Sequence, residues 1–144
     1  MISALTRLLP LALGLASLAS FCVLLAGAQI PRRLRWREEL ALLTPFNRKI
    51  VWTYYAFVGG TIACFGMMTL VLRDEMVRGD RSAVVLAAFM AAWWVARILV
   101  DAFWYSRADW PKGRGFALGH ALLTFAFVAM ALTYIAVVAV ALAA

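Results

Sequence analysis

The sequence has few residues of the kinds that bind metals, cofactors or nucleotides. Its single histidine excludes bis-histidine haem ligation. Cys22 and Cys64 show no CxxC spacing and lie in apolar segments, which predicts buried structural thiols. Their predicted depths differ by about 9 Å, which argues against a shared metal. A phosphate-binding loop and a G-x-G-x-x-G motif are both absent. We therefore predict no metal site, and the sequence identifies no cofactor.

Charged residues are also scarce. They make up 15% of the 144 residues, whereas 66% are hydrophobic, and the mean hydropathy is +0.90. Soluble domains contain about 45–50% apolar residues, so this composition predicts an all-α integral membrane protein. The length suits one membrane domain over residues 1–144. The net charge of +7 is better explained by basic loops that face anionic lipid than by nucleic-acid binding, so we expect no nucleic-acid partner.

Four long apolar segments predict a four-transmembrane-helix bundle. They cover about residues 8–30, 50–72, 82–105 and 116–140, and about 20 residues suffice to cross a bilayer. The first segment has a rival interpretation as a cleaved signal peptide, because Ala26-Gly27-Ala28 imitates a cleavage site. The length of the apolar run and the arginines that follow it favour a retained helix.

The connection between the first two spans predicts an amphipathic helix over about residues 34–43. Trp36, Leu40 and Leu43 share one face, and arginines and glutamates occupy much of the rest. Such a helix lies at the membrane interface; a docking surface for a partner is the alternative. Thr44-Pro45 then predicts an N-cap followed by proline at the first helical position.

The distribution of lysine and arginine predicts the orientation. The first and third loops hold nine of these residues, and the opposite side holds four. The nine are Arg32, Arg33, Arg35, Arg37, Arg48, Lys49, Arg107, Lys112 and Arg114. Because basic loops stay in the cytoplasm, both termini are expected outside it, in an inner membrane of bacterial type.

The third span carries charge into the membrane. Its uncharged part, residues 82–96, reaches only about 22 Å, so the span must include Arg97 and Asp101, which share a helix face. Counting from the cytoplasmic boundary places Asp101, His120 and Tyr54 about 6 Å inside, and Arg97 and Thr124 about 12 Å. We call these five residues the candidate polar cluster. It either fixes helix register or serves a ligand, a lipid head group or a proton.

The stretch from Ala96-Arg97 through Tyr105 and Arg114 to Phe116–Gly119 is similar to the last two helices of MAPEG proteins. Those proteins are four-helix membrane enzymes and regulators of eicosanoid and glutathione metabolism, usually trimers. Their Asn-x-x-Glu signature is absent here, because Ile50 is the third residue after Asn47.

The first functional hypothesis is a small non-catalytic membrane protein that acts as a subunit or scaffold. It would pack against membrane lipid, other membrane subunits or copies of itself. Small residues spaced by four along several spans favour close helix contact. They are Ala12, Ala16 and Ser20; Ala56, Gly60 and Cys64; Gly59 and Ala63; and Ala88, Ala92 and Ala96.

The alternative is a MAPEG-like enzyme, or another that handles lipids or quinones, with a site facing the cytoplasm. Arg97 would bind an anionic group, Asp101 would orient Arg97, and His120 or Tyr54 would handle a proton. A small transporter is the third hypothesis. The efflux families of this size usually place an acidic residue in the first span, and this first span has none.

Overall fold

The computed structural model describes residues 2–106 and 113–143, and within them all regular structure is helical. The long helices are α1 (Ile2–Ala28), α4 (Pro45–Val71), α6 (Arg81–Phe103) and α7 (Arg114–Leu142). The short ones are α2 (Ile30–Arg33), α3 (Trp36–Glu39), the 3-10 helix η1 (Leu40–Leu42) and α5 (Arg73–Arg78). The described residues include four helices long and apolar enough to cross a membrane, as the sequence predicts.

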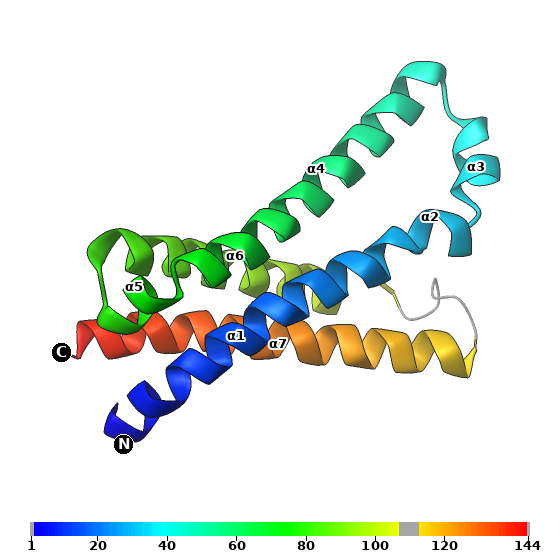
Figure 1. The fold of residues 1–144 in the computed structure, drawn as a ribbon. Helices are drawn as coiled ribbons and strands as arrows, with labels where there is room; N and C mark the ends of the chain where they lie inside the picture. Colours follow the sequence, from blue (N-terminus) through cyan, green and yellow to red (C-terminus); the bar gives the residue numbers. More distant parts are fainter. Residues whose placement is uncertain (1, 107–112, 144) are drawn as a thin grey trace.

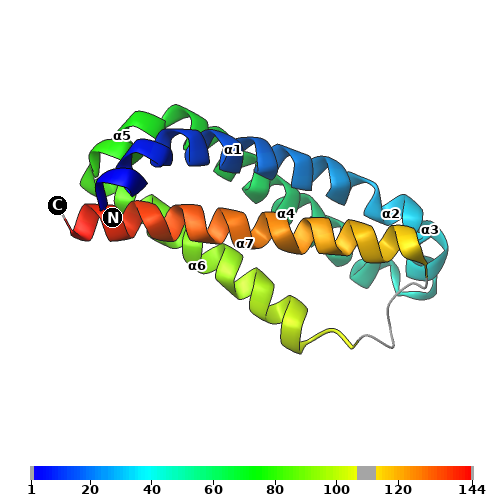
Figure 2. The same cartoon turned by 90° about the horizontal axis from the view of Figure 1, so that it is seen from below.

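The four long helices form a bundle that is closed at one end and spread at the other. Helix α1 packs on both α4 and α7, and α6 packs on α7. Both termini and α5 lie at one end of the bundle, which we call the α5 end (Figure 1). The connection between α1 and α4 and the end of α6 lie at the other, which we call the loop end. Helices α4 and α6 diverge toward the loop end in both views (Figures 1 and 2).

The buried core sits toward the α5 end. The buried residues of α4 are Phe65, Gly66 and Thr69, all in its last turns. Burial on α6 stops at Trp94, and on α7 it begins at Phe127. The first helix contributes Leu9, Leu13, Ala16, Ser17, Ser20 and Val23 to the same core. The first helix therefore shares one core with the other three long helices.

Helices α1 and α4 approach closely where small residues meet. The Ser17 hydroxyl donates a hydrogen bond to the Gly66 carbonyl at 2.8 Å. A Cβ placed on Gly66 would lie 3.1 Å from the Phe21 ring and 3.2 Å from the Ser20 Cβ. The predicted Ala12-Ala16-Ser20 spacing therefore serves packing within the chain, which small residues make possible.

A buried polar contact joins α4 to α7 in this core. The Thr69 hydroxyl donates to the Phe65 carbonyl at 2.7 Å, and its oxygen lies 2.7 Å from the Tyr134 hydroxyl. Because the Thr69 proton points to that carbonyl, Tyr134 is the donor in the second bond. Both side chains are completely buried, so each hydroxyl depends on this arrangement for its partner.

Tyr134→Phe is expected to lower the free energy of unfolding by about 1 kcal/mol, because it removes one buried hydrogen bond and leaves the ring in place. Thermal unfolding of the purified protein in mild detergent measures the change. Tyr54→Phe is the matched control, since Tyr54 is 69% exposed, and should change stability little. Equal effects of the two substitutions would contradict the assigned bond.

The inner face of α4 is uncovered toward the loop end. Tyr54, Val58, Phe65 and Thr69 recur at helical spacing and lie on one face. Phe65 and Thr69 are buried, whereas Val58 is 46% exposed and Tyr54 is 69% exposed. In the middle of the bundle, α4 and α6 are joined by edge-on contacts of Phe65 with Phe89 and Trp93. This face of α4 is therefore buried near the α5 end and exposed near the loop end.

The connection between α1 and α4 differs from the predicted helix over 34–43. It is divided into α2, α3 and η1. The division lies at Arg35, whose φ of 51° is left-handed and interrupts any continuous helix. The predicted start of the next helix is confirmed: Thr44 is the N-cap, accepts from the Asn47 N–H at 3.4 Å, and precedes Pro45.

Two other expectations need correction. Helix α6 ends at Phe103 rather than Tyr105, and Trp104 beyond it is 82% exposed. Cys22 and Cys64 are exposed, not buried. Apolar segments of this bundle have one inner face each, and both cysteines fall on outer faces.

The short helix α5 lies in the connection between α4 and α6, and it is capped at its C-terminus by Gly79, whose φ is 78°. The Arg78 guanidinium bonds Asp80 at 3.0 Å, and this hydrogen bond raises the pKa of Arg78. Because the pKa of Arg78 is higher in the folded chain than in the unfolded chain, the Arg78–Asp80 bond stabilises the fold at every pH below the unfolded pKa of Arg78. This contribution is lost only in strongly alkaline solution. The turn is therefore insensitive to ordinary changes of pH through Arg78.

Candidate functional site

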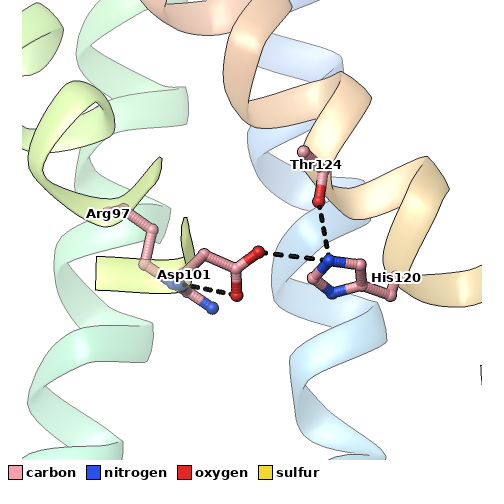
Figure 3. Close-up of polar contacts among 4 residues, drawn as sticks. All are labelled: Arg97, Asp101, His120 and Thr124. Atoms are coloured by element: carbon pink, nitrogen blue, oxygen red, sulfur yellow. Dashed lines mark hydrogen bonds and ion pairs between the residues drawn. The ribbon is translucent and has the colours of Figure 1, made fainter. Parts of the chain in front are cut away.

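Four of the five residues of the candidate polar cluster, all except Tyr54, lie together between α6 and α7 on the loop-end side of the core. Arg97 Nη1 donates to Asp101 Oδ1 at 3.3 Å within α6. Asp101 Oδ2 lies 3.2 Å from His120 Nε2 on α7 (Figure 3). The structure thus contains the predicted pair of Arg97 with Asp101 and the predicted contact of this pair with His120. Asp101 is the centre of the cluster, since its two oxygens face two different helices.

His120 Nε2 also lies 3.2 Å from the Thr124 hydroxyl oxygen, one turn along α7 (Figure 3). An ionised carboxylate can only accept a hydrogen bond. A neutral His120 beside an ionised Asp101 must therefore carry its ring proton on Nε2 and donate it to the carboxylate. The Thr124 hydroxyl oxygen lies next to the same N–H group. The cluster ties α6 to α7 where the hydrophobic core has ended.

Arg97 makes a second contact with α7. Its guanidinium carbon lies 5.1 Å from the centre of the Phe127 ring, a cation–π geometry. The Trp94 ring stacks on the same Phe127 at 5.2 Å. The Trp94 indole N–H is buried and has no acceptor among the described residues. Phe127 and Trp94 are not among the predicted site residues. Helical spacing could have identified both, because Phe127 shares a face of α7 with His120 and Trp94 lies one turn before Arg97 on α6.

Burial differs across the cluster. The Asp101 side chain is 12% exposed, His120 34% and Arg97 39%. A guanidinium has five N–H donors, and among the described residues only Asp101 accepts a hydrogen bond from Arg97. The carboxylate is thus enclosed by its partners, while the guanidinium keeps donors directed elsewhere.

Tyr54 does not join the cluster. Its ring is 69% exposed, and none of the described polar contacts links it to Arg97, Asp101 or His120. The neighbouring Tyr55 points inward instead and donates to the Gly27 carbonyl at 2.8 Å. Tyr54 lies on the face of α4 that buries Phe65 and Thr69 further along the helix, but that face is exposed at the level of Tyr54.

The predicted interfacial residues are placed around an aromatic group. Trp36 packs edge-on against Trp52 and Tyr55 at ring distances of 5.5 and 5.1 Å. Leu40 is half-buried, and Leu43 is 37% exposed. Trp36 therefore holds the connection onto α4, while much of the segment stays open to its surroundings.

Comparison with protein-family models, curated proteins and solved structures gave no match. The similarity of residues 96–119 to MAPEG proteins therefore stays a prediction from a short pattern. The function must be argued from the geometry alone.

Proposed function

We propose that this chain is an integral membrane protein whose four long helices span the bilayer, and that it acts as a non-catalytic subunit or scaffold. The observation that carries the proposal is a stripe of small residues on the outside of α4. Ala56, Gly60 and Cys64 are all exposed, and a Cβ on Gly60 would meet no atom within 4 Å. Small residues on a membrane helix permit close approach of another helix.

Helix α4 is also the least covered of the four long helices. Its most apolar window is 17% buried, against 28–33% for the other three. Glycine is unfavourable in a helix interior unless it allows a contact. A helix from a second copy or from another subunit would supply that contact. On α6, the predicted stripe of Ala88, Ala92 and Ala96 is exposed in the same way.

The orientation follows from charge. Both termini lie at the α5 end (Figure 1), and the loop end carries most of the lysines and arginines; Arg107 and Lys112 lie outside the described residues. We propose that the loop end faces the cytoplasm of a bacterial-type cell. In that placement Trp36, Leu40 and Leu43 lie at the lipid interface, where aromatic residues are common.

Oxidative cross-linking through Cys64 tests self-association along α4. A two-fold pair of parallel bundles that meet along this stripe brings equivalent residues together at one depth. Copper-phenanthroline oxidation in membranes should then give a covalent dimer for wild type and for Cys22→Ser. Cys64→Ser should give none. Cys22 is the matched control because it is also exposed. A dimer that depends on Cys22 instead, or none at all, would contradict self-association along α4.

A second candidate function, an enzyme that handles lipids or quinones, is favoured by one observation. Arg97, Asp101 and His120 form a connected polar group on the loop-end side of the core. In that case Arg97 would bind an anionic substrate group and His120 would carry a proton. Turnover of glutathione-conjugation and quinone substrates by the purified protein, lost in His120→Ala, would support it.

A further inference from the structure

The guanidinium of Arg97 has more hydrogen-bond donors than its surroundings satisfy. Asp101 takes up one N–H at 3.3 Å, and the Phe127 ring contacts the guanidinium carbon at 5.1 Å. The side chain is nevertheless 39% exposed. If the chain spans a membrane, as proposed above, this guanidinium lies near the polar surface of the bilayer, where an acceptor from outside the chain can take up its remaining N–H donors.

The position of this group matches the head-group region. Asp101 lies two residues before the last residue of α6, about 3 Å along the helix axis. His120 lies six residues after the first residue of α7, about 9 Å. The Arg97 guanidinium is bonded to Asp101 and is therefore within reach of the polar surface of the bilayer. It is too shallow to face only hydrocarbon.

The charge around the guanidinium favours an anion. Asp101 is the one acidic group in contact with Arg97 among the described residues, and its oxygens are directed to Arg97 and His120. The connection at the same end carries an excess of positive charge over Glu38 and Glu39. Its basic residues are Arg32, Arg33, Arg35, Arg37, Arg48 and Lys49. An anion that approaches Arg97 is thus attracted by the positive charge of this connection. The one nearby carboxylate, Asp101, is already paired with Arg97 and His120.

The exposed face of α4 provides room for the rest of such a molecule. Val58 and Tyr54 on α4 are exposed on the face that buries Phe65 and Thr69 closer to the α5 end. An acyl chain can lie along this apolar stripe, while its head group reaches Arg97. Guanidinium groups bind phosphate oxygens through paired N–H groups, and phosphate is the anion common to phospholipids.

We propose that Arg97 binds a phosphate group at the loop end, beside its contacts with Asp101 on α6 and Phe127 on α7, and that Asp101 and His120 position its guanidinium. A phospholipid or a soluble phosphate ester supplies the same chemistry. This site depends on the proposed membrane insertion and not on self-association along α4.

The test compares ligands of matched structure on the purified full chain in mild detergent. Microscale thermophoresis measures the dissociation constants of dioleoyl phosphatidylglycerol, of dioleoylglycerol, which lacks the phosphate, and of inorganic phosphate. We expect phosphatidylglycerol to bind at least about tenfold more tightly than dioleoylglycerol, as one or two charge-assisted hydrogen bonds require.

Arg97→Gln should remove that difference, and Arg97→Lys should retain part of it. Arg114→Gln is the control, because it changes the net charge equally at the exposed start of α7 and should change binding less than threefold. Thermal unfolding verifies that each variant is folded. If Arg97→Gln does not fold, the weaker binding of phosphatidylglycerol by Arg97→Lys is the result that tests the site. Equal binding of the two lipids, together with inorganic phosphate binding that Arg97→Gln abolishes, would support the site with a soluble ligand. Equal binding of the two lipids without such a loss, or equal effects of Arg97→Gln and Arg114→Gln, would overturn the proposal.

Discussion

Gly66→Val is expected to lower the free energy of unfolding of the isolated chain by about 2–3 kcal/mol, the upper part of the range for overpacked cores. The first added carbon would already lie 3.1 Å from the Phe21 ring and 3.2 Å from the Ser20 Cβ, and valine adds two further methyl groups. Helix α1 would have to move away from α4, and the bond from Ser17 to the Gly66 carbonyl would lengthen or break. Thermal unfolding in detergent, followed by tryptophan fluorescence, measures the loss.

Gly60→Val on the same helix is the matched control. The Cβ that it adds would meet no atom within 4 Å, and Gly60 is exposed, so the isolated chain should lose less than about 0.5 kcal/mol, as for ordinary surface substitutions. The comparison separates packing inside the chain from packing against a partner. Similar losses for Gly60→Val and Gly66→Val would mean that the close approach of α1 and α4 is not specific to Gly66.

Arg97→Ala is expected to destabilise the chain more than the double substitution Arg97→Ala, Asp101→Ala does. The single change leaves a carboxylate that is 12% exposed with His120 as its remaining partner among those described. Removal of one member of a buried ion pair costs about 3–5 kcal/mol. The exposure of Arg97 and the contact with His120 reduce this, so we expect about 1–2 kcal/mol.

A double-mutant cycle measures the coupling of Arg97 and Asp101 directly. Its four members are the wild type, the two single alanine variants and the double variant, each unfolded thermally in the same detergent. We expect a coupling energy of about 1 kcal/mol or more. Effects that add to within about 0.5 kcal/mol would show that the ion pair does not contribute as a pair.

Much of the fold could be predicted because its signals are local. Charge at the ends of each apolar segment limits where a helix can lie in a membrane, and the observed helices begin and end within a few residues of the predicted bounds, except that α1 extends further at its start. The pairs Arg97–Asp101 and His120–Thr124 are each four residues apart on one helix, so their contacts follow from helix geometry. The contact between Asp101 and His120 was predicted from matching depth.

The direction in which a residue faces could not be predicted in the same way. Counting residues gives a depth, but adjacent residues on a helix point about 100° apart. Tyr54 and Tyr55 share a level, yet Tyr55 bonds to Gly27 while Tyr54 is exposed. The same ambiguity explains why Cys22 and Cys64 were expected to be buried.

The spread of the loop end depends on contacts between distant segments. Nothing in the sequence of α4 distinguishes the exposed Val58 from the buried Phe65 on the same face, because both are apolar. Burial there is decided by where α6 and α7 lie. The burial of Met76 in the short helix α5 likewise depends on the helices that pack around it.

The mass of the intact assembly tests the proposed function most directly. The protein is extracted from its membrane with the mildest effective detergent or with a lipid-preserving polymer, and its native mass is measured. We predict a multiple of the 15.9 kDa chain mass, or a larger complex with a second membrane protein, and a shift toward the single chain for Gly60→Val. A mass of one chain with bound lipid in every mild condition would contradict the proposal that this protein works through helix packing with partners.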